Sequence, residues 1–208
     1  MTLAMVGRAF AQPVQDAQRV FRTTLEAMSR PGRPLPFDKP MLSAMDTPGL
    51  SPGLTALLLG LLDAETSLWL APPLATDEAV QYLRFHSGVR LAGSAAEAAF
   101  VVVGVAQARP ELWSILDRGT DEAPQDGATL IVDLTSLRAG EAGQPGALTL
   151  RGPGIETRHT LTAVDVVASF WLARAELESD YPRGIDLILC SGDRIAAVPR
   201  TTHVSLEG

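Results

Sequence analysis

Two apolar runs constrain the fold of this chain more than any other feature. Phe100–Val105 is a continuous run of apolar, mostly β-branched residues, and Ala128–Leu134 has the same interior character. Such runs are typical of strands that are covered on both faces of a sheet. Three further segments are predicted strands: Thr66–Leu70, Leu148–Arg151 and Glu156–Leu161. Because helical segments separate several of these strands, the pattern predicts a three-layer α/β/α domain.

Five segments are predicted to be helices: Pro13–Met28, Leu54–Leu62, Thr76–His86, Pro110–Arg118 and Val164–Glu178. The first has apolar residues at helical spacing, which predicts a face that packs on the domain. That face consists of Val14, Ala17, Val20, Phe21, Leu25 and Met28. The second helix, which follows a capping Ser51-Pro52, is apolar almost all round, so we expect it to lie in the core or against a partner subunit.

Proline shapes the segment after the first helix. Pro31-Gly32 ends that helix, and three more prolines lie within residues 33–40. Each proline favours extended geometry in the residue before it, so this segment is predicted to be an ordered loop without helix.

The chain closes with a predicted β-hairpin, in which Ser191-Gly192-Asp193 joins Ile185–Cys190 to Ile195–Val198. This hairpin and the adjacent strands after residue 128 predict a mixed central sheet. Pro199 ends the second strand because proline has no amide proton to donate to a neighbouring strand.

Composition bounds the class of protein. A chain of 208 residues, 46% of them hydrophobic, suits one domain over residues 1–208, with an N-terminal helical arm at about 1–40 and a loop at Gly140–Gly146. Its net charge of -7 and lack of a basic run exclude a general nucleic-acid or anionic-membrane binder. Leu54–Leu62, the longest apolar run, is about half the ~20 residues that a membrane helix needs. We expect a soluble cytoplasmic protein.

Two segments contain candidates for anion binding. Where the chain leaves the hairpin, a guanidinium can act as a bidentate donor beside two hydroxyls, with the Asp186 carboxylate at the same end of the sheet. In Arg151-Gly152-Pro153-Gly154, two glycines at a strand end can turn backbone amides into an anion nest. The candidate ligand-binding residues are Gly152, Gly154, Asp186, Arg200, Thr201 and Thr202. The alternatives are a capped sheet edge or contact with a partner subunit's carboxylate for the first segment, and a plain tight turn for the second.

No segment supplies a complete catalytic or metal-binding pattern. The histidines, His86, His159 and His203, are more than forty residues apart and have no ligand at metal-binding spacing. The single cysteine, Cys190, lies in an apolar strand, where a buried structural thiol is expected. We therefore nominate no catalytic residue and no metal.

Segments near the two ends of the chain carry a resemblance. Pro-Arg-Thr-Thr after a Gly-Ile-Asp strand, together with the early Phe21-Arg22 and Ala27–Gly32, resembles the PhnH subunit family of the bacterial carbon-phosphorus lyase system. The resemblance spans most of the chain. It implies a fold similar to the large domain of pyridoxal-phosphate-dependent transferases. Pyridoxal catalysis needs a lysine that the sheet places for a Schiff base. The only lysine, Lys39, precedes every predicted strand, so we predict that the fold has no cofactor.

The resemblance also implies a function. A chain of this family contributes to an alpha-D-ribose 1-methylphosphonate 5-triphosphate synthase, which displaces adenine from ATP with an alkylphosphonate in phosphonate catabolism. The implied partners are the lyase subunits PhnG, PhnI and PhnJ, with a homodimer expected in isolation and catalytic residues mainly on partner subunits. From the N-terminal segment, Arg22, Arg30 and Arg33 are candidates to point towards the Asp186 end of the sheet, and a first-helix arm over a neighbour's C-terminus would explain why the recognisable segments lie at opposite ends.

Two alternatives of other classes remain from the residues alone. One is a stand-alone enzyme that binds a phosphorylated ligand between Gly152-Pro153-Gly154 and Arg200. The other is a purely structural scaffold subunit without a ligand.

Overall fold

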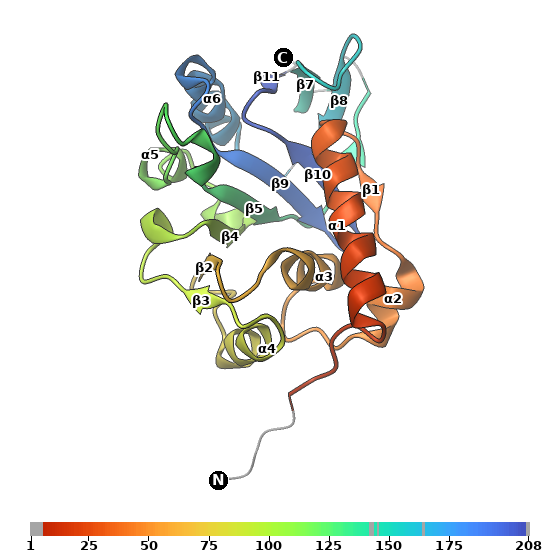
Figure 1. Ribbon diagram of the computed structural model, residues 1–208. Coiled ribbons are helices and arrows are strands. Elements are labelled where there is room, and N and C mark those ends of the chain that lie inside the picture. Colours follow the sequence, from red (N-terminus) through yellow and green to blue (C-terminus); the bar gives the residue numbers. More distant parts are fainter. Residues whose placement is uncertain (1–5, 142–143, 145, 164, 207–208) are drawn as a thin grey trace.

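The central sheet has seven strands and is mixed, as the sequence predicts. A computed structural model describes residues 6–141, 144, 146–163 and 165–206. The strand order is β1 (Leu35–Pro36), β10 (Arg194–Val198), β9 (Asp186–Ser191), β5 (Thr129–Asp133), β4 (Phe100–Gly104), β2 (Ser67–Leu70) and β3 (Arg90–Leu91). The five strands from β9 to β3 are parallel, whereas β10 pairs antiparallel with both β9 and β1. Figure 1 shows the long strands β9 and β5 in the middle of the molecule.

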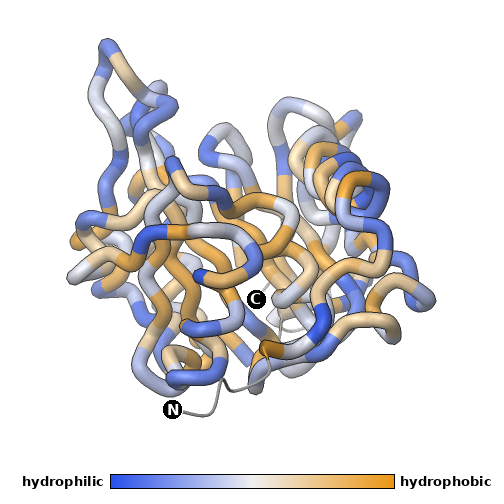
Figure 2. The backbone as a smooth tube through the Cα atoms, turned by 60° about the horizontal axis from the view of Figure 1, so that its bottom comes forward, coloured by the Kyte–Doolittle hydropathy of each residue, from blue (hydrophilic) through white to orange (hydrophobic). Residues whose placement is uncertain are grey.

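Two hydrophobic cores lie on the two faces of this sheet. Successive side chains of a strand point to opposite faces, so Val101 and Val103 lie in one core and Val102 in the other. The second core is covered by α1 (Pro13–Ser29), α2 (Lys39–Ala44), α3 (Pro52–Leu61) and α4 (Asp77–Ser87). The first core is covered by α5 (Leu112–Ile115), α6 (Ala168–Glu176) and a second sheet. Figure 2 shows hydrophobic segments gathered in the interior and hydrophilic ones at the outer loops.

The second sheet corrects the predicted place of two strands. The predicted strands at 148–151 and 156–161 form β7 (Ala147–Arg151) and β8 (His159–Thr162), which pair with each other rather than with the central sheet. With β6 (Arg138–Ala139) and β11 (His203–Leu206), they form an antiparallel sheet of order β11-β7-β8-β6. Leu148, Leu150 and Leu161 bury its inner face in the first core. The layer on that side of the central sheet is therefore part helix and part sheet.

The apolar helix α3 lies in the core, which decides between the two places that the sequence left open. Leu54, Leu57 and Leu58 have no exposed surface within the chain. The Ser51 hydroxyl accepts a hydrogen bond from the Leu54 amide at 3.4 Å, as expected for the residue that caps the helix.

The predicted packing face of α1 is only partly correct: Val20 is completely buried and Ala17 and Met28 are partly buried, but the other three residues are exposed. Val14, Phe21 and Leu25 are 66%, 48% and 51% exposed, whereas the buried residues are Asp16, Val20, Thr24 and Ala27. The cause is the close approach of α1 to α3. A Cβ atom at Gly60 of α3 would lie 2.5 Å from Cγ1 of Val20, so the glycine lets α1 approach closely with Val20 facing α3.

Three other predictions needed adjustment. The segment 33–40, predicted to lack helix, contains β1 and the start of α2 at Lys39; Pro40 stands in the first turn, where proline is tolerated. The helix predicted at 110–118 shrinks to the four residues of α5. The helix predicted from Val164 begins at Ala168; Val164 itself, residues 1–5 of the predicted arm, residues 207–208, and residues 142, 143 and 145 of the predicted loop lie outside the described residues.

No helix in the described part of the chain is both long and apolar enough to cross a membrane.

Candidate functional site

Three segments that are far apart in the sequence meet beside the second sheet. The Gly32 amide, just after α1, donates a hydrogen bond to the carbonyl of Ala197 at 2.9 Å. A Cβ atom at Gly154 would lie 2.1 Å from the Ser29 carbonyl oxygen, and one at Gly152 would lie 2.8 Å from that of Thr201. The Gly-Pro-Gly loop therefore fits between the end of α1 and the turn that follows β10. Both glycines also have positive φ, of +134° and +81°, which disfavours any side chain there.

Arg200 is held by groups of its own chain. Its amide donates to Oδ1 of Asp186 at 2.8 Å, and its Nη2 donates to Oδ2 at 2.7 Å. Its Nε lies 3.3 Å from both carboxylate oxygens, and its Nη1 donates to the Pro124 carbonyl. The two side chains of this ion pair are only 15% and 19% exposed. This is a partly buried bidentate pair, which fixes the turn after β10 to the start of β9.

The threonines of the predicted group have different surroundings. Thr202 is completely buried, and its amide donates to the Pro199 carbonyl at 2.9 Å. Its hydroxyl has no hydrogen-bond partner among the described residues. Thr201 is partly exposed. The structure thus brings together Gly152, Gly154, Asp186, Arg200, Thr201 and Thr202, although a ligand role for them stays a prediction.

A buried arginine beneath this turn was missed by sequence reasoning. Arg174 of α6 is 1% exposed, and its Nη2 donates to the carbonyl oxygens of Pro199 at 2.9 Å and Thr202 at 3.5 Å. Its guanidinium lies 5.9 Å from the ring centroid of Trp113. Burial lowers the pKa of Arg174, as does nearby Arg200, while Glu178 and Asp186 oppose the shift. Its position one turn after the apolar Phe170 and Trp171 was the only sequence signal.

A second polar cluster lies at the carboxyl ends of the parallel strands, where α/β sheets commonly bind ligands. Asp133 ends β5, and its Oδ1 accepts a hydrogen bond from the Ser51 hydroxyl at 2.9 Å. Burial raises the pKa of Asp133, and the Ser51 hydrogen bond opposes that shift. Burial, assisted by Asp133, also raises the pKa of the Cys190 thiol. The thiol is therefore protonated at neutral pH, which agrees with the predicted structural role.

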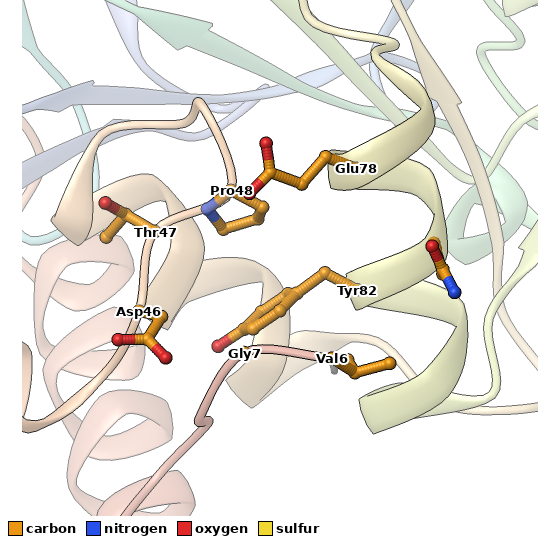
Figure 3. A pocket seen from close by; sticks show the side chains of 8 residues that line it. Val6, Gly7, Asp46, Thr47, Pro48, Glu78 and Tyr82 are labelled. Atoms are coloured by element: carbon orange, nitrogen blue, oxygen red, sulfur yellow. The ribbon is translucent and has the colours of Figure 1, made fainter. Parts of the chain in front are cut away.

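The N-terminal segment closes a pocket of about 370 Å³ against α4 (Figure 3). It is lined by Val6, Gly7, Asp46, Thr47, Pro48, Glu78, Gln81 and Tyr82. Arg8 holds the Asp46 carboxylate through its amide, at 2.7 Å, and its Nη2, at 3.0 Å, which lowers the pKa of Asp46. The Tyr82 hydroxyl donates to the Arg8 carbonyl at 2.9 Å. Burial, with a smaller contribution from Asp46, raises the pKa of Tyr82 to about 12.

The single lysine does not fit a pyridoxal phosphate site. The side chain of Lys39 is 78% exposed at the start of α2, and its Nζ lies 3.7 Å from Oδ2 of Asp193 in the hairpin turn. A Schiff-base lysine must instead be held by the sheet against the cofactor ring. The histidines are also placed apart: His86 contacts the Gly7 carbonyl, His159 that of Pro31, and His203 the Glu178 carboxylate.

Comparison with known proteins identifies the family. The model of the bacterial phosphonate metabolism protein PhnH matches residues 8–205. The chain belongs to the PhnH family. It is 33% identical over 202 residues to the alpha-D-ribose 1-methylphosphonate 5-triphosphate synthase subunit PhnH of Rhizobium meliloti (strain 1021), covering 96% of this chain and 95% of that protein. It is also 33% identical over 194 residues to HtxG of Stutzerimonas stutzeri, described by its name as a C-P lyase subunit protein, covering 92% and 87% of the two chains.

Family membership confirms the resemblance in the sequence. The matched range includes the end of α1, the Gly-Pro-Gly loop and the turn after β10. The PhnH motifs that lie at opposite ends of this sequence are therefore neighbours in the fold.

Proposed function

We propose that this chain is a subunit of a carbon-phosphorus lyase system and contributes to ribose 1-methylphosphonate 5-triphosphate synthesis. The observation that carries the proposal is the match to the Rhizobium PhnH subunit over nearly the full length of both proteins. In the proposed reaction, an alkylphosphonate displaces adenine from ATP. Because the proposed reaction consumes ATP, we also propose a cytoplasmic location.

The chain contributes to this reaction chiefly through its interfaces, with PhnG, PhnI and PhnJ as the partners. The support is the bonding of the predicted ligand group. The Arg200 guanidinium is neutralised by Asp186 and donates to a backbone carbonyl, so its donors are engaged by the fold. The Ser51 hydroxyl, which donates to Asp133, also caps α3 by accepting from the Leu54 amide, so this hydroxyl–carboxylate pair is engaged by the fold as well. We assign most of the catalytic residues to the partner subunits.

We also propose that the fold is that of the large domain of pyridoxal-phosphate-dependent transferases, without the cofactor. The mixed central sheet covered on both faces supports this proposal. The exposed position of Lys39 supports a role without pyridoxal phosphate.

Adenine release by purified components tests the proposed role. The chain alone, mixed with ATP and methylphosphonate, is expected to release no adenine. A mixture of PhnG, PhnI, PhnJ and this chain is expected to release adenine, and omission of this chain should reduce the rate strongly. Adenine release by the chain alone would place catalysis here and overturn the proposal, as would an unchanged rate without it.

The predicted ligand role of Arg200 is tested separately, because substitution of Arg200 also removes its ion pair with Asp186. Arg200→Ala leaves the partly buried Asp186 carboxylate unpaired, so it is expected to lower the melting temperature. Titration of the unmodified chain with ATP or pyrophosphate, followed by calorimetry, asks whether a phosphorylated ligand binds. Saturable binding that Arg200→Lys weakens would favour the ligand role over a purely structural one.

A further inference from the structure

Helix α1 exposes more large hydrophobic side chains than any other element in the described part of the chain. Three of the nine such side chains lie on it: Val14, Phe21 and Leu25. The other six are Phe85, Leu91, Ile115, Val167, Leu172 and Tyr181. Single exposed hydrophobic residues are ordinary, whereas a row of them marks a binding surface.

The exposed residues of α1 follow the spacing of a coiled-coil seam. Val14, Gln18, Phe21, Leu25 and Met28 are separated alternately by four and three residues, which is the heptad pattern of a helix that packs along another helix. We call these five residues the α1 seam. Gln18 is the polar member, at a position where a single polar residue sets the register of a helix pair. Met28 is partly buried at the end of the seam.

The opposite side of α1 already packs against the domain. Asp16, Val20, Thr24 and Ala27 are buried there, and the Thr24 hydroxyl donates to the Val20 carbonyl at 2.9 Å. Figure 1 shows α1 running alongside α3 and β10. The helix therefore buries this side within the chain and leaves the seam exposed from Val14 to Leu25, whereas Met28 also packs against the second core.

One edge of the seam carries a cation that the chain itself does not neutralise. Arg22 is exposed and has no ion-pair partner among the described residues. The neighbouring arginines do have ion-pair partners. Arg19 pairs with Asp16 and Asp38, and Arg30, just after the helix, pairs with Glu26. Arg22 comes directly after the seam residue Phe21 and three residues before Leu25. It therefore occupies a heptad position that flanks the seam.

A second α1 helix offers no carboxylate to Arg22 at the flanking positions. In a helix pair, charges at the flanking positions set the partner and its direction. The flanking positions of the α1 seam hold Gln15, Ala17, Arg22, Thr24 and Ser29. None of these is acidic, so neither a parallel nor an antiparallel pairing of two α1 helices would neutralise Arg22.

We propose that the α1 seam binds an amphipathic helix of a different subunit, with apolar residues at heptad spacing and a carboxylate opposite Arg22. This inference rests on the proposed function, which requires non-identical partners. The seam spans 15 residues, or about 22 Å of helix. It supplies the apolar centre of an interface, because a stable complex buries about 800 Å² on each partner.

Substitutions on the seam test the proposal in the assembled complex. The tagged full-length chain is co-expressed with PhnG, PhnI and PhnJ, and the recovered subunits are quantified by mass spectrometry. Phe21→Glu or Leu25→Glu is expected to reduce recovery of the partners at least about tenfold, as for residues at the centre of an interface. Phe85→Glu is the matched control, since Phe85 is 70% exposed on α4, and it should leave recovery unchanged.

Arg22 supplies a second variant that avoids any question of folding. Arg22→Glu is expected to reduce recovery several-fold, and Arg22→Lys to retain most of it. Unchanged recovery with both Phe21→Glu and Arg22→Glu would overturn the seam. A chain that dimerises alone and becomes a monomer on Phe21→Glu would show that the seam binds a second copy, which also overturns it. If the unmodified chain recovers no subunit, the proposed function itself fails.

Discussion

Helices α1 and α3 lie against each other on one face of the central sheet, yet they bury different kinds of side chain. Helix α3 buries three leucines completely, whereas α1 buries Thr24 and Asp16 and exposes Phe21 and Leu25. The difference follows from position: α1 packs its Val20 side against Gly60 of α3 and against β10, which leaves Phe21 and Leu25 exposed. The apolar residues in a sequence therefore predict that a helix packs against the domain. Which face of the helix is buried depends on the neighbouring elements.

Truncation of one leucine in each helix should give the largest difference in unfolding free energy between the two helices. Leu57→Ala on α3 removes a fully buried side chain and is expected to cost about 2–5 kcal/mol of unfolding free energy. Leu25→Ala on α1 should change it by less than about 0.5 kcal/mol, because half of that side chain is exposed. Urea unfolding of the isolated chain measures both. Equal losses would show that Leu25 is packed in solution.

The next largest loss of unfolding free energy is expected at the contact between Gly60 of α3 and Val20 of α1. Gly60→Ala places a Cβ atom against Val20, and the crowding should cost about 1–3 kcal/mol. The same substitution in a Val20→Ala background should cost less, because the space is then available. A double-mutant cycle by urea unfolding measures the coupling. Additive losses would mean that the two side chains do not meet.

Alkaline pH should destabilise the core around α3 through the buried Tyr82. Tyr82 lies in the same core as α3, and its pKa is raised to about 12 from an ordinary value of about 10. Its contribution to stability is complete below pH 10 and is lost as the pH rises from about 10 to 12, because the unfolded state loses this proton first. Thermal unfolding of Tyr82→Phe should show a weaker decline over that range than the unmodified chain. An identical decline in the two proteins would show that groups other than Tyr82 cause the loss of stability at alkaline pH.

A small effect is also expected at Thr24, a buried polar residue of α1. The Thr24 hydroxyl donates only within its own helix, to the Val20 carbonyl, which the helix backbone also satisfies. Thr24→Val should therefore change the unfolding free energy by less than about 1 kcal/mol. A loss above about 2 kcal/mol, measured by the same urea unfolding, would show that the hydroxyl is needed between α1 and α3.

The sequence predicted those parts of the fold that depend on local pattern. The interior strands β4 and β5, the closing hairpin and the cap of α3 were correct because a continuous apolar run, a turn or a capping serine is visible within a few residues. The exposed face of α1 and the separate sheet of β7 and β8 were not predictable, since both depend on contacts with distant segments.

The candidate site divides in the same way. The sequence identified Asp186 and Arg200 as neighbours at one end of the sheet, and the structure joins them in an ion pair. It could not show that Gly154 packs against Ser29, because this contact joins residues more than one hundred positions apart. Arg174 was missed because a charged side chain on an apolar helix face is ordinarily expected at the surface.

Affinity purification from cells that use methylphosphonate as their only phosphorus source tests the account most directly. The tagged chain is recovered at its natural level, and every co-purifying protein is identified and quantified. The account predicts that the other lyase subunits are recovered in a fixed ratio to this chain. Recovery of the chain alone, as a monomer or a homodimer, would contradict it.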